Sequence, residues 1–116
     1  MKDGFKSLIV WQKAMVLVKA VYNVCDSLPQ RENFALADQL RRAAVSVPSN
    51  IAEGTRRTTR KDYVQFLSIA HGSLAEVETQ LLLIQELYPK NTVDTQIELT
   101  QEVSRMLYAL IVKLKN

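Results

Sequence analysis

The sequence predicts an all-α protein, folded as an antiparallel up-down-up-down bundle of four helices. Apolar residues recur at spacings of three and four along nearly all of its 116 residues, which is the period of amphipathic helices. Three glycines and three prolines leave room for few turns, and no segment shows the strict alternation of a half-buried strand. A chain of this length holds one core, so we expect a single domain over residues 1–116.

The first predicted helix covers residues 8–27, with Ser7 as its N-cap and Pro29 ending it. One apolar stripe at helical spacing comprises Leu8, Trp11, Met15, Val18, Tyr22 and Cys25. A second set widens that stripe beyond one face, namely Ile9, Val10, Leu17, Val21 and Val24. This helix is therefore apolar over most of its circumference.

The second predicted helix covers residues 32–54 and contains Pro48. Its inner face is predicted to hold Leu36, Leu40, Ala43, Val47 and Ile51. A proline inside a helix removes one backbone hydrogen bond and crowds the carbonyl of Ala44. We expect a kink at Pro48, because the apolar spacing keeps its phase across it. The alternative is a helix that breaks and restarts with Pro48 in its first turn.

The third helix is predicted to begin at Thr59, where Asp62 three residues later resembles a capping box, and to end before Pro89. Its inner stripe has the clearest spacing in the chain: Tyr63, Phe66, Ala70, Leu74, Val77, Leu81, Ile84 and Tyr88. The fourth helix is predicted to follow a cap at Thr92 and to reach Lys115. Its inner stripe comprises Val93, Ile97, Val103, Leu107, Leu110 and Leu114. Short loops make the four helices antiparallel neighbours.

Some apolar residues exceed what a lone bundle can bury. Four successive residues on a helix point in all directions, so Leu82 or Leu83 must face away from the core. Such surface favours a homo-oligomer over the alternative in which loops or long side chains cover it. Gly72, in a row of small residues on the same helix, indicates either a close helix approach or a glycine on a solvated face.

Positive charge is concentrated in one stretch of the sequence. Residues 41–61 contain six basic residues and one acid, a sum of +5, whereas the whole chain carries +3. The basic residues are Arg41, Arg42, Arg56, Arg57, Arg60 and Lys61. Arginine forks match phosphate oxygens, and a helix N-terminus adds further donors, so this pattern favours a nucleic-acid site. The competing interpretation is a solvated surface, because Asp38 and Glu53 are spaced to pair with these arginines along a helix.

Catalytic and metal chemistry have little support in the sequence. His71 is the single histidine and is expected to be a hydrogen-bonded or surface group. Cys25 follows an apolar helix face and is expected to be a buried, unreactive thiol. It is the single cysteine of the sequence, which excludes an internal disulfide. No nucleotide-binding glycine loop or zinc motif is present, so we expect no cofactor and no metal. No targeting peptide or membrane-spanning stretch is recognisable, which favours a cytoplasmic protein.

Three blocks of sequence carry a resemblance to a known family. They are VWQKA at 10–14, QLRRAAVSVPSNIAEG at 39–54 and FLSIAHGSLAE at 66–76. These blocks resemble the 23S ribosomal RNA intervening-sequence proteins, and the similarity extends over nearly the whole chain. The resemblance implies a four-helix bundle that assembles into a homopentamer and has no enzymatic activity.

A related branch of that family comprises accessory proteins of diversity-generating retroelements, which present a basic surface to nucleic acid and to a reverse transcriptase. By this similarity the six basic residues of 41–61 become the candidates for RNA contact. Asn50 and Glu53 are expected to be structural polar groups that satisfy backbone atoms freed by Pro48 and fix the following turn.

These observations lead to one leading expectation and two alternatives. The leading one is a non-enzymatic homo-oligomer that binds structured RNA or another nucleic acid through the basic corner between the second and third helices. The first alternative is an oligomeric scaffold that recruits a protein partner and has no nucleic-acid role. The second, an enzyme with a pocket between subunits, has the least support.

Overall fold

The computed structural model describes residues 4–116. It consists of four α-helices, α1 (Ile9–Asp26), α2 (Leu36–Thr55), α3 (Arg60–Leu87) and α4 (Asp94–Lys115). Two short 3-10 turns precede the first two helices, η1 (Gly4–Ser7) and η2 (Gln30–Glu32). The described residues contain no strand, so the all-α prediction is confirmed.

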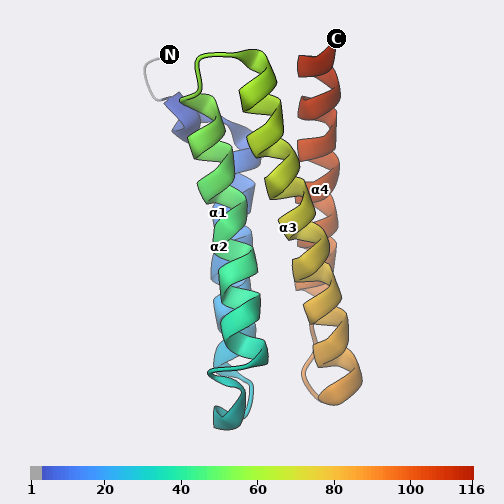
Figure 1. Ribbon diagram of the computed structural model, residues 1–116. Helices are drawn as coiled ribbons and strands as arrows, with labels where there is room; N and C mark the ends of the chain where they lie inside the picture. Colours follow the sequence, from blue (N-terminus) through green and yellow to red (C-terminus); the bar gives the residue numbers. More distant parts are fainter. Residues whose placement is uncertain (1–3) are drawn as a thin grey trace.

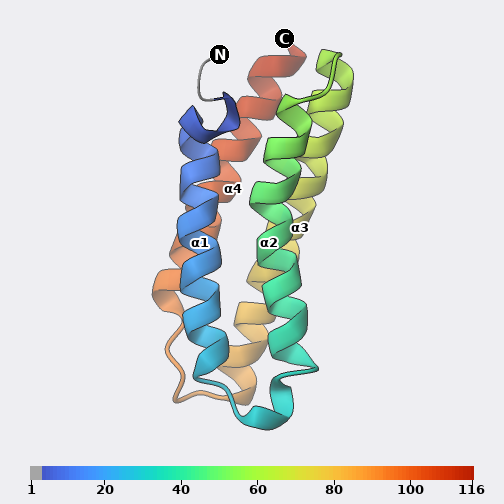
Figure 2. The same ribbon diagram turned by 90° about the vertical axis from the view of Figure 1, so that its left-hand side faces the viewer.

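The helices alternate in direction and form a bundle of about 44 × 21 × 20 Å (Figures 1 and 2). Each helix packs against its neighbours in sequence, and α1 also packs against α4, which closes the ring. The connection from α2 to α3 lies at the same end of the bundle as η1 and the end of α4 (Figure 1). The predicted up-down-up-down topology is therefore confirmed.

The predicted core stripes are correct for α2 and α3, and for most of α4. Leu40, Val47 and Ile51 of α2 are fully buried, as are Leu81 and Ile84 of α3. Residues at the edges of these stripes are half-buried and pack against the core. They are Leu36, Tyr63, Tyr88, Ile97, Leu110 and Leu114.

The stripe predicted for α1 is correct only in part. Cys25 is buried, and Leu8, Trp11 and Val18 pack against the core, but Met15 and Tyr22 are 45% and 42% exposed. The buried face of α1 comprises Val10, Ala14, Leu17, Val21, Val24 and Cys25. Both sets of residues are apolar at helical spacing, so periodicity does not distinguish them. Arg41 of α2 lies over the Tyr22 ring, which places Tyr22 on the flank of α1 beside α2.

Helix α2 continues without interruption through Pro48. The alternative in which the helix breaks and restarts there is therefore wrong. The kink at Pro48 stays a prediction. The proline ring itself is buried, so the position contributes to packing as well as to backbone geometry.

Two of the predicted helix caps are wrong. Ser7 lies in η1, where its hydroxyl donates to the carbonyl of Gly4, and Leu8 occupies the N-cap position of α1. At α4 the N-cap is Val93 rather than Thr92. Neither Leu8 nor Val93 makes a side-chain capping bond.

Cys25 is buried in the core at 1% exposure, where its thiol donates to the carbonyl of Ala37 at 3.5 Å. Burial raises the pKa of this thiol. At pH 8 we expect a thiol reagent to modify the native protein at least ~100-fold more slowly than the chain in guanidinium, because modification must await local or global opening. The release of chromophore from a disulfide reagent measures both rates. Equal rates would show that the thiol is accessible in the native state.

Candidate nucleic-acid interface

The six basic residues singled out in the sequence separate into two groups in the structure. Arg41 and Arg42 lie in the second turn of α2, whereas the other four lie beyond its far end and in the first turn of α3. Fifteen residues of helix separate Arg41 from Arg56, a rise of about 22 Å. The expectation of one basic corner is therefore corrected, because the first two arginines lie toward the opposite end of the bundle.

Arg41 and Arg42 make local contacts near the start of α2. The Arg41 guanidinium donates to the carbonyl of Asn33 at 3.0 Å and lies 5.9 Å from the centre of the Tyr22 ring. Arg42 forms an ion pair with Asp38 at 3.0 Å. Arg41 therefore helps to hold the α1–α2 connection. The Arg42 pair is exposed, so it contributes little to stability.

At the other end of α2, Arg56 and Arg57 lie against aromatic rings. The Arg57 guanidinium is 4.5 Å from the centre of the Phe66 ring and forms an ion pair with Glu53 at 2.7 Å. The Arg56 guanidinium is 5.7 Å from the centre of the Phe5 ring. A guanidinium stacked on a ring keeps its orientation while its N–H edge stays available to an anion.

Arg60 and Lys61 occupy the first turn of α3. Both are exposed, and within residues 4–116 neither forms an ion pair. The positive end of a helix dipole disfavours cations in its first turn, and these two cations outnumber Asp62, which is the acidic residue of that turn. The predicted cap is confirmed on one side, since the Thr59 hydroxyl accepts from the N–H of Asp62 at 3.1 Å.

Gly54 sets the geometry of this corner. It is buried in the last turn of α2, and a Cβ at its position would lie 3.0 Å from atoms of both Tyr63 and Phe66 and 3.3 Å from the Tyr63 carbonyl. The two helices can approach this closely because the glycine has no side chain. Burial against α2 also raises the pKa of Tyr63. In contrast, a Cβ at Gly72 would meet nothing within 4 Å, so that glycine lies on an open face of the described chain.

Asn50 connects α2 to α3 through a short polar chain. Its amide donates to the Ser46 carbonyl at 2.8 Å and to the Ser46 hydroxyl at 2.9 Å. The Ser46 and Ser73 hydroxyls are 2.8 Å apart. Asn50 therefore bonds to Ser46 rather than to the Ala44 carbonyl, which is the group that Pro48 leaves without its helical donor.

Glu53 is likewise engaged away from Pro48. Its carboxylate pairs with Arg57 across one helical turn. Glu53 therefore contacts the start of the α2–α3 connection, and its contribution to the stability of that turn stays a prediction.

Three further lysines, which are not among the six predicted residues, lie at this end of the bundle. The topology brings Lys6 of η1 and Lys113 and Lys115 of α4 to the end where α2 passes into α3 (Figure 1). We call the combined set the basic end; it comprises Lys6, Arg56, Arg57, Arg60, Lys61, Lys113 and Lys115. All seven are exposed, and the same turns carry two carboxylates, Glu53 and Asp62. In an up-down-up-down bundle the end of the fourth helix lies beside the connection between the second and third helices. The predicted topology therefore contained the signal that places Lys113 and Lys115 at this end.

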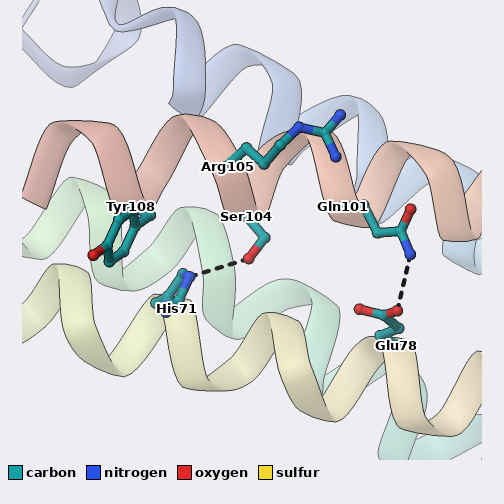
Figure 3. A pocket seen from close by; sticks show the side chains of 6 residues that line it. All are labelled: His71, Glu78, Gln101, Ser104, Arg105 and Tyr108. Carbon is teal, nitrogen blue, oxygen red and sulfur yellow. Dashed lines mark hydrogen bonds between the residues drawn. The ribbon is translucent and has the colours of Figure 1, made fainter.

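A polar groove runs between α3 and α4, and Figure 3 shows its lining side chains. His71 of α3 bonds to the Ser104 hydroxyl of α4 at 3.1 Å, and the Gln101 amide donates to Glu78 at 3.1 Å. The expectation of a hydrogen-bonded His71 is therefore confirmed. We refer to this feature as the α3–α4 groove; its lining residues are His71, Glu78, Gln101, Ser104, Arg105 and Tyr108.

Within residues 4–116, no cluster of three or more histidine, cysteine or acidic side chains is arranged to hold a metal ion. No helix of this part of the chain combines the length and hydrophobicity needed to cross a membrane.

The family model of the 23S rRNA-intervening sequence protein matches residues 6–109.

The chain belongs to the 23S rRNA-intervening sequence protein family.

A solved structure supports the fold independently. It is a protein of unknown function from the S23 ribosomal protein family of Bacteroides thetaiotaomicron VPI-5482, 21% identical to this chain with a TM-score of 0.81. The match covers 89% of this chain and 98% of that one. No curated protein matches the chain. At this level of identity the neighbour establishes that this intervening-sequence protein shares its four-helix fold.

Proposed function

We propose that this intervening-sequence protein is a homo-oligomer that binds structured RNA, or another nucleic acid, through its basic end. The observation that carries the proposal is the pair Arg60 and Lys61, two exposed cations in the first turn of α3 that form no ion pair within residues 4–116. A phosphate beside that turn would pair with both side chains and with the helix dipole. The resemblance to retroelement accessory proteins, which present a basic surface to nucleic acid, supports the same assignment.

Binding of this kind depends on phosphates rather than on bases. Arg56 and Arg57, oriented by Phe5 and Phe66, present planar forks to backbone oxygens, and the lysines add mobile point charges. Phosphate contacts fix the position of a nucleic acid without reading its sequence. We therefore assign affinity, and little sequence discrimination, to the basic end.

The proposal includes a non-enzymatic role, a cytoplasmic location and self-assembly. His71 has a hydroxyl partner rather than the carboxylate that orients a catalytic histidine.

Self-assembly is supported by exposed apolar side chains on α3, which form the kind of surface expected of a subunit contact. They are Ile69, Leu82, Leu83 and Leu87. A pentamer, as the family resemblance implies, would present five copies of the basic end. Sedimentation in solution measures the number of subunits.

A salt titration tests the phosphate mechanism. We expect the association constant for an RNA hairpin to fall steeply between 50 and 200 mM salt, because each neutralised phosphate releases counterions. Fluorescence anisotropy with a labelled hairpin measures the slope of log K against log salt. Binding that is independent of salt would contradict the proposal.

One observation favours the alternative of a protein-interaction scaffold. Phe34, between η2 and α2, is 96% exposed and lies at the end of the bundle opposite the basic end. Exposed aromatics are typical anchors of protein interfaces. The ultraviolet absorbance ratio of the freshly purified protein separates the two functions, since only the nucleic-acid function predicts co-purified RNA.

A further inference from the structure

The α3–α4 groove is a second candidate for contact with a ligand. It is an open surface groove of about 410 Å³ between two helices. Its lining is mixed: an aromatic ring, an imidazole and a hydroxyl lie close together, and the Arg105 side chain extends from α4 away from α3 at the edge of the groove (Figure 3). That composition suits a flat ligand with polar edges.

Tyr108 supplies the apolar surface of the groove. Its side chain is 58% exposed, and its ring centre lies 6.0 Å from that of His71 with the planes tilted by 36°. Within residues 4–116 the ring is not buried by any other segment and stays open to solvent. An exposed aromatic ring is the platform on which unpaired nucleobases stack in proteins that bind single strands.

The polar groups of the groove are placed around this ring. His71 and Ser104 bond to each other, and each keeps capacity for a further hydrogen bond with a ligand. Arg105 forms no ion pair within the described residues. The groove's carboxylate, Glu78, is engaged by Gln101. The part of the groove around Tyr108 therefore has no unpaired carboxylate in its lining, and Arg105, about one turn away on α4, is a cation at its edge.

The groove is connected to the basic end along both of its helices. Seven residues of α4 separate Tyr108 from Lys115, a rise of about 10 Å, and ten residues of α3 separate His71 from Lys61, a rise of about 15 Å. A nucleic-acid strand advances at least ~3.4 Å per nucleotide. A strand whose phosphates lie on the basic end therefore reaches the groove within a few nucleotides.

We propose that an unpaired nucleotide of the bound RNA stacks on Tyr108 in the α3–α4 groove, with its edge on the His71–Ser104 pair and its phosphate on Arg105. This inference rests on the proposed function and refines its substrate class. The bound RNA must contain a loop, bulge or single-stranded end beside the segment held by the basic end.

The test compares two probes, a labelled single-stranded RNA and a labelled RNA duplex of equal length. We expect Tyr108→Ala to weaken binding of the single strand roughly 5- to 100-fold, as for loss of one stacked base, and to leave duplex binding unchanged. Tyr108→Phe keeps the ring and should bind as the wild type does. Tyr22→Ala removes a comparably exposed tyrosine outside the groove and serves as the matched control.

Two further measurements locate the nucleotide. Arg105→Gln should reduce the salt slope for the single strand by about 0.7, which corresponds to one phosphate. A 5-bromouridine in the strand should cross-link to the peptide that contains Tyr108. An unchanged melting temperature for Tyr108→Ala excludes unfolding as the cause of any loss.

The outcomes distinguish this inference from the proposed function. If the wild type binds neither probe, both fail. If salt-dependent binding is present but Tyr108→Ala binds the single strand as the wild type does, or loses both probes equally, the stacking site is wrong and the basic end stands. A cross-link that maps away from the α3–α4 groove would also overturn the site.

Discussion

Replacing Arg56, Arg57, Arg60 and Lys61 together with glutamine is expected to weaken RNA binding about 100- to 1,000-fold near 0.1 M salt. Arg56, Arg60 and Lys61 form no ion pair within residues 4–116 and can each neutralise one phosphate, whereas Arg57 must exchange its pair with Glu53 for one. Each lost contact removes about 0.7 to 0.9 from the salt slope. The side chains are exposed and glutamine is a good helix former, so the fold should be unaffected. Anisotropy titrations at several salt concentrations measure both the affinity and the slope.

The control for this variant removes the same charge elsewhere. Glutamine at Lys19, Arg31, Arg42 and Lys90 also takes the formal charge from +3 to −1, and these four exposed residues lie outside the basic end. We expect this second variant to keep most of its affinity. Equal losses in both variants would show that overall charge, rather than the basic end, accounts for binding.

Gly54→Ala is expected to destabilise the protein despite placing a better helix former in α2. The added Cβ would lie 3.0 Å from the Phe66 Cβ and from a Tyr63 ring carbon, and 3.3 Å from the Tyr63 backbone oxygen. Overpacking of this kind costs about 1–3 kcal/mol, which equals or exceeds the gain of about 1 kcal/mol in helix propensity. Urea denaturation measures the free energy of unfolding.

Gly72→Ala is the matched control for that substitution. It adds the same methyl group to a helix interior where nothing lies within 4 Å. We expect it to raise the free energy of unfolding by up to ~1 kcal/mol. A stabilising Gly54→Ala would contradict the close approach of α2 and α3, and a destabilising Gly72→Ala would indicate that another subunit packs on that face of α3.

Much of the fold followed from periodicity because three of the helices have one apolar stripe each. The stripes of α2 and α3 predicted their buried faces, and Thr59 with Asp62 predicted the start of α3. Helix α1 was ambiguous because it carries two apolar stripes. Its orientation is decided by contacts with α2 and α4 that lie far away in the sequence.

The candidate site was predicted only in part, for a related reason. Charged residues that form one run in the sequence can lie far apart in space when a helix separates them. Arg41 and Arg42 belong to the same basic run as Arg56, although about 22 Å of helix lies between them. The lysines of α4 were missed because they are distant in sequence and become neighbours of the α2–α3 connection through the topology.

The placement of the end of α4 beside the α2–α3 connection has a practical consequence for labelling. A tag or reporter fused after residue 116 begins next to the seven cations, and an acidic fusion partner there would occupy them in place of a ligand. The turn at residues 89–92 lies at the far end of the molecule (Figure 2). A fluorophore or short epitope inserted there reports on the bundle without shielding the surface under study.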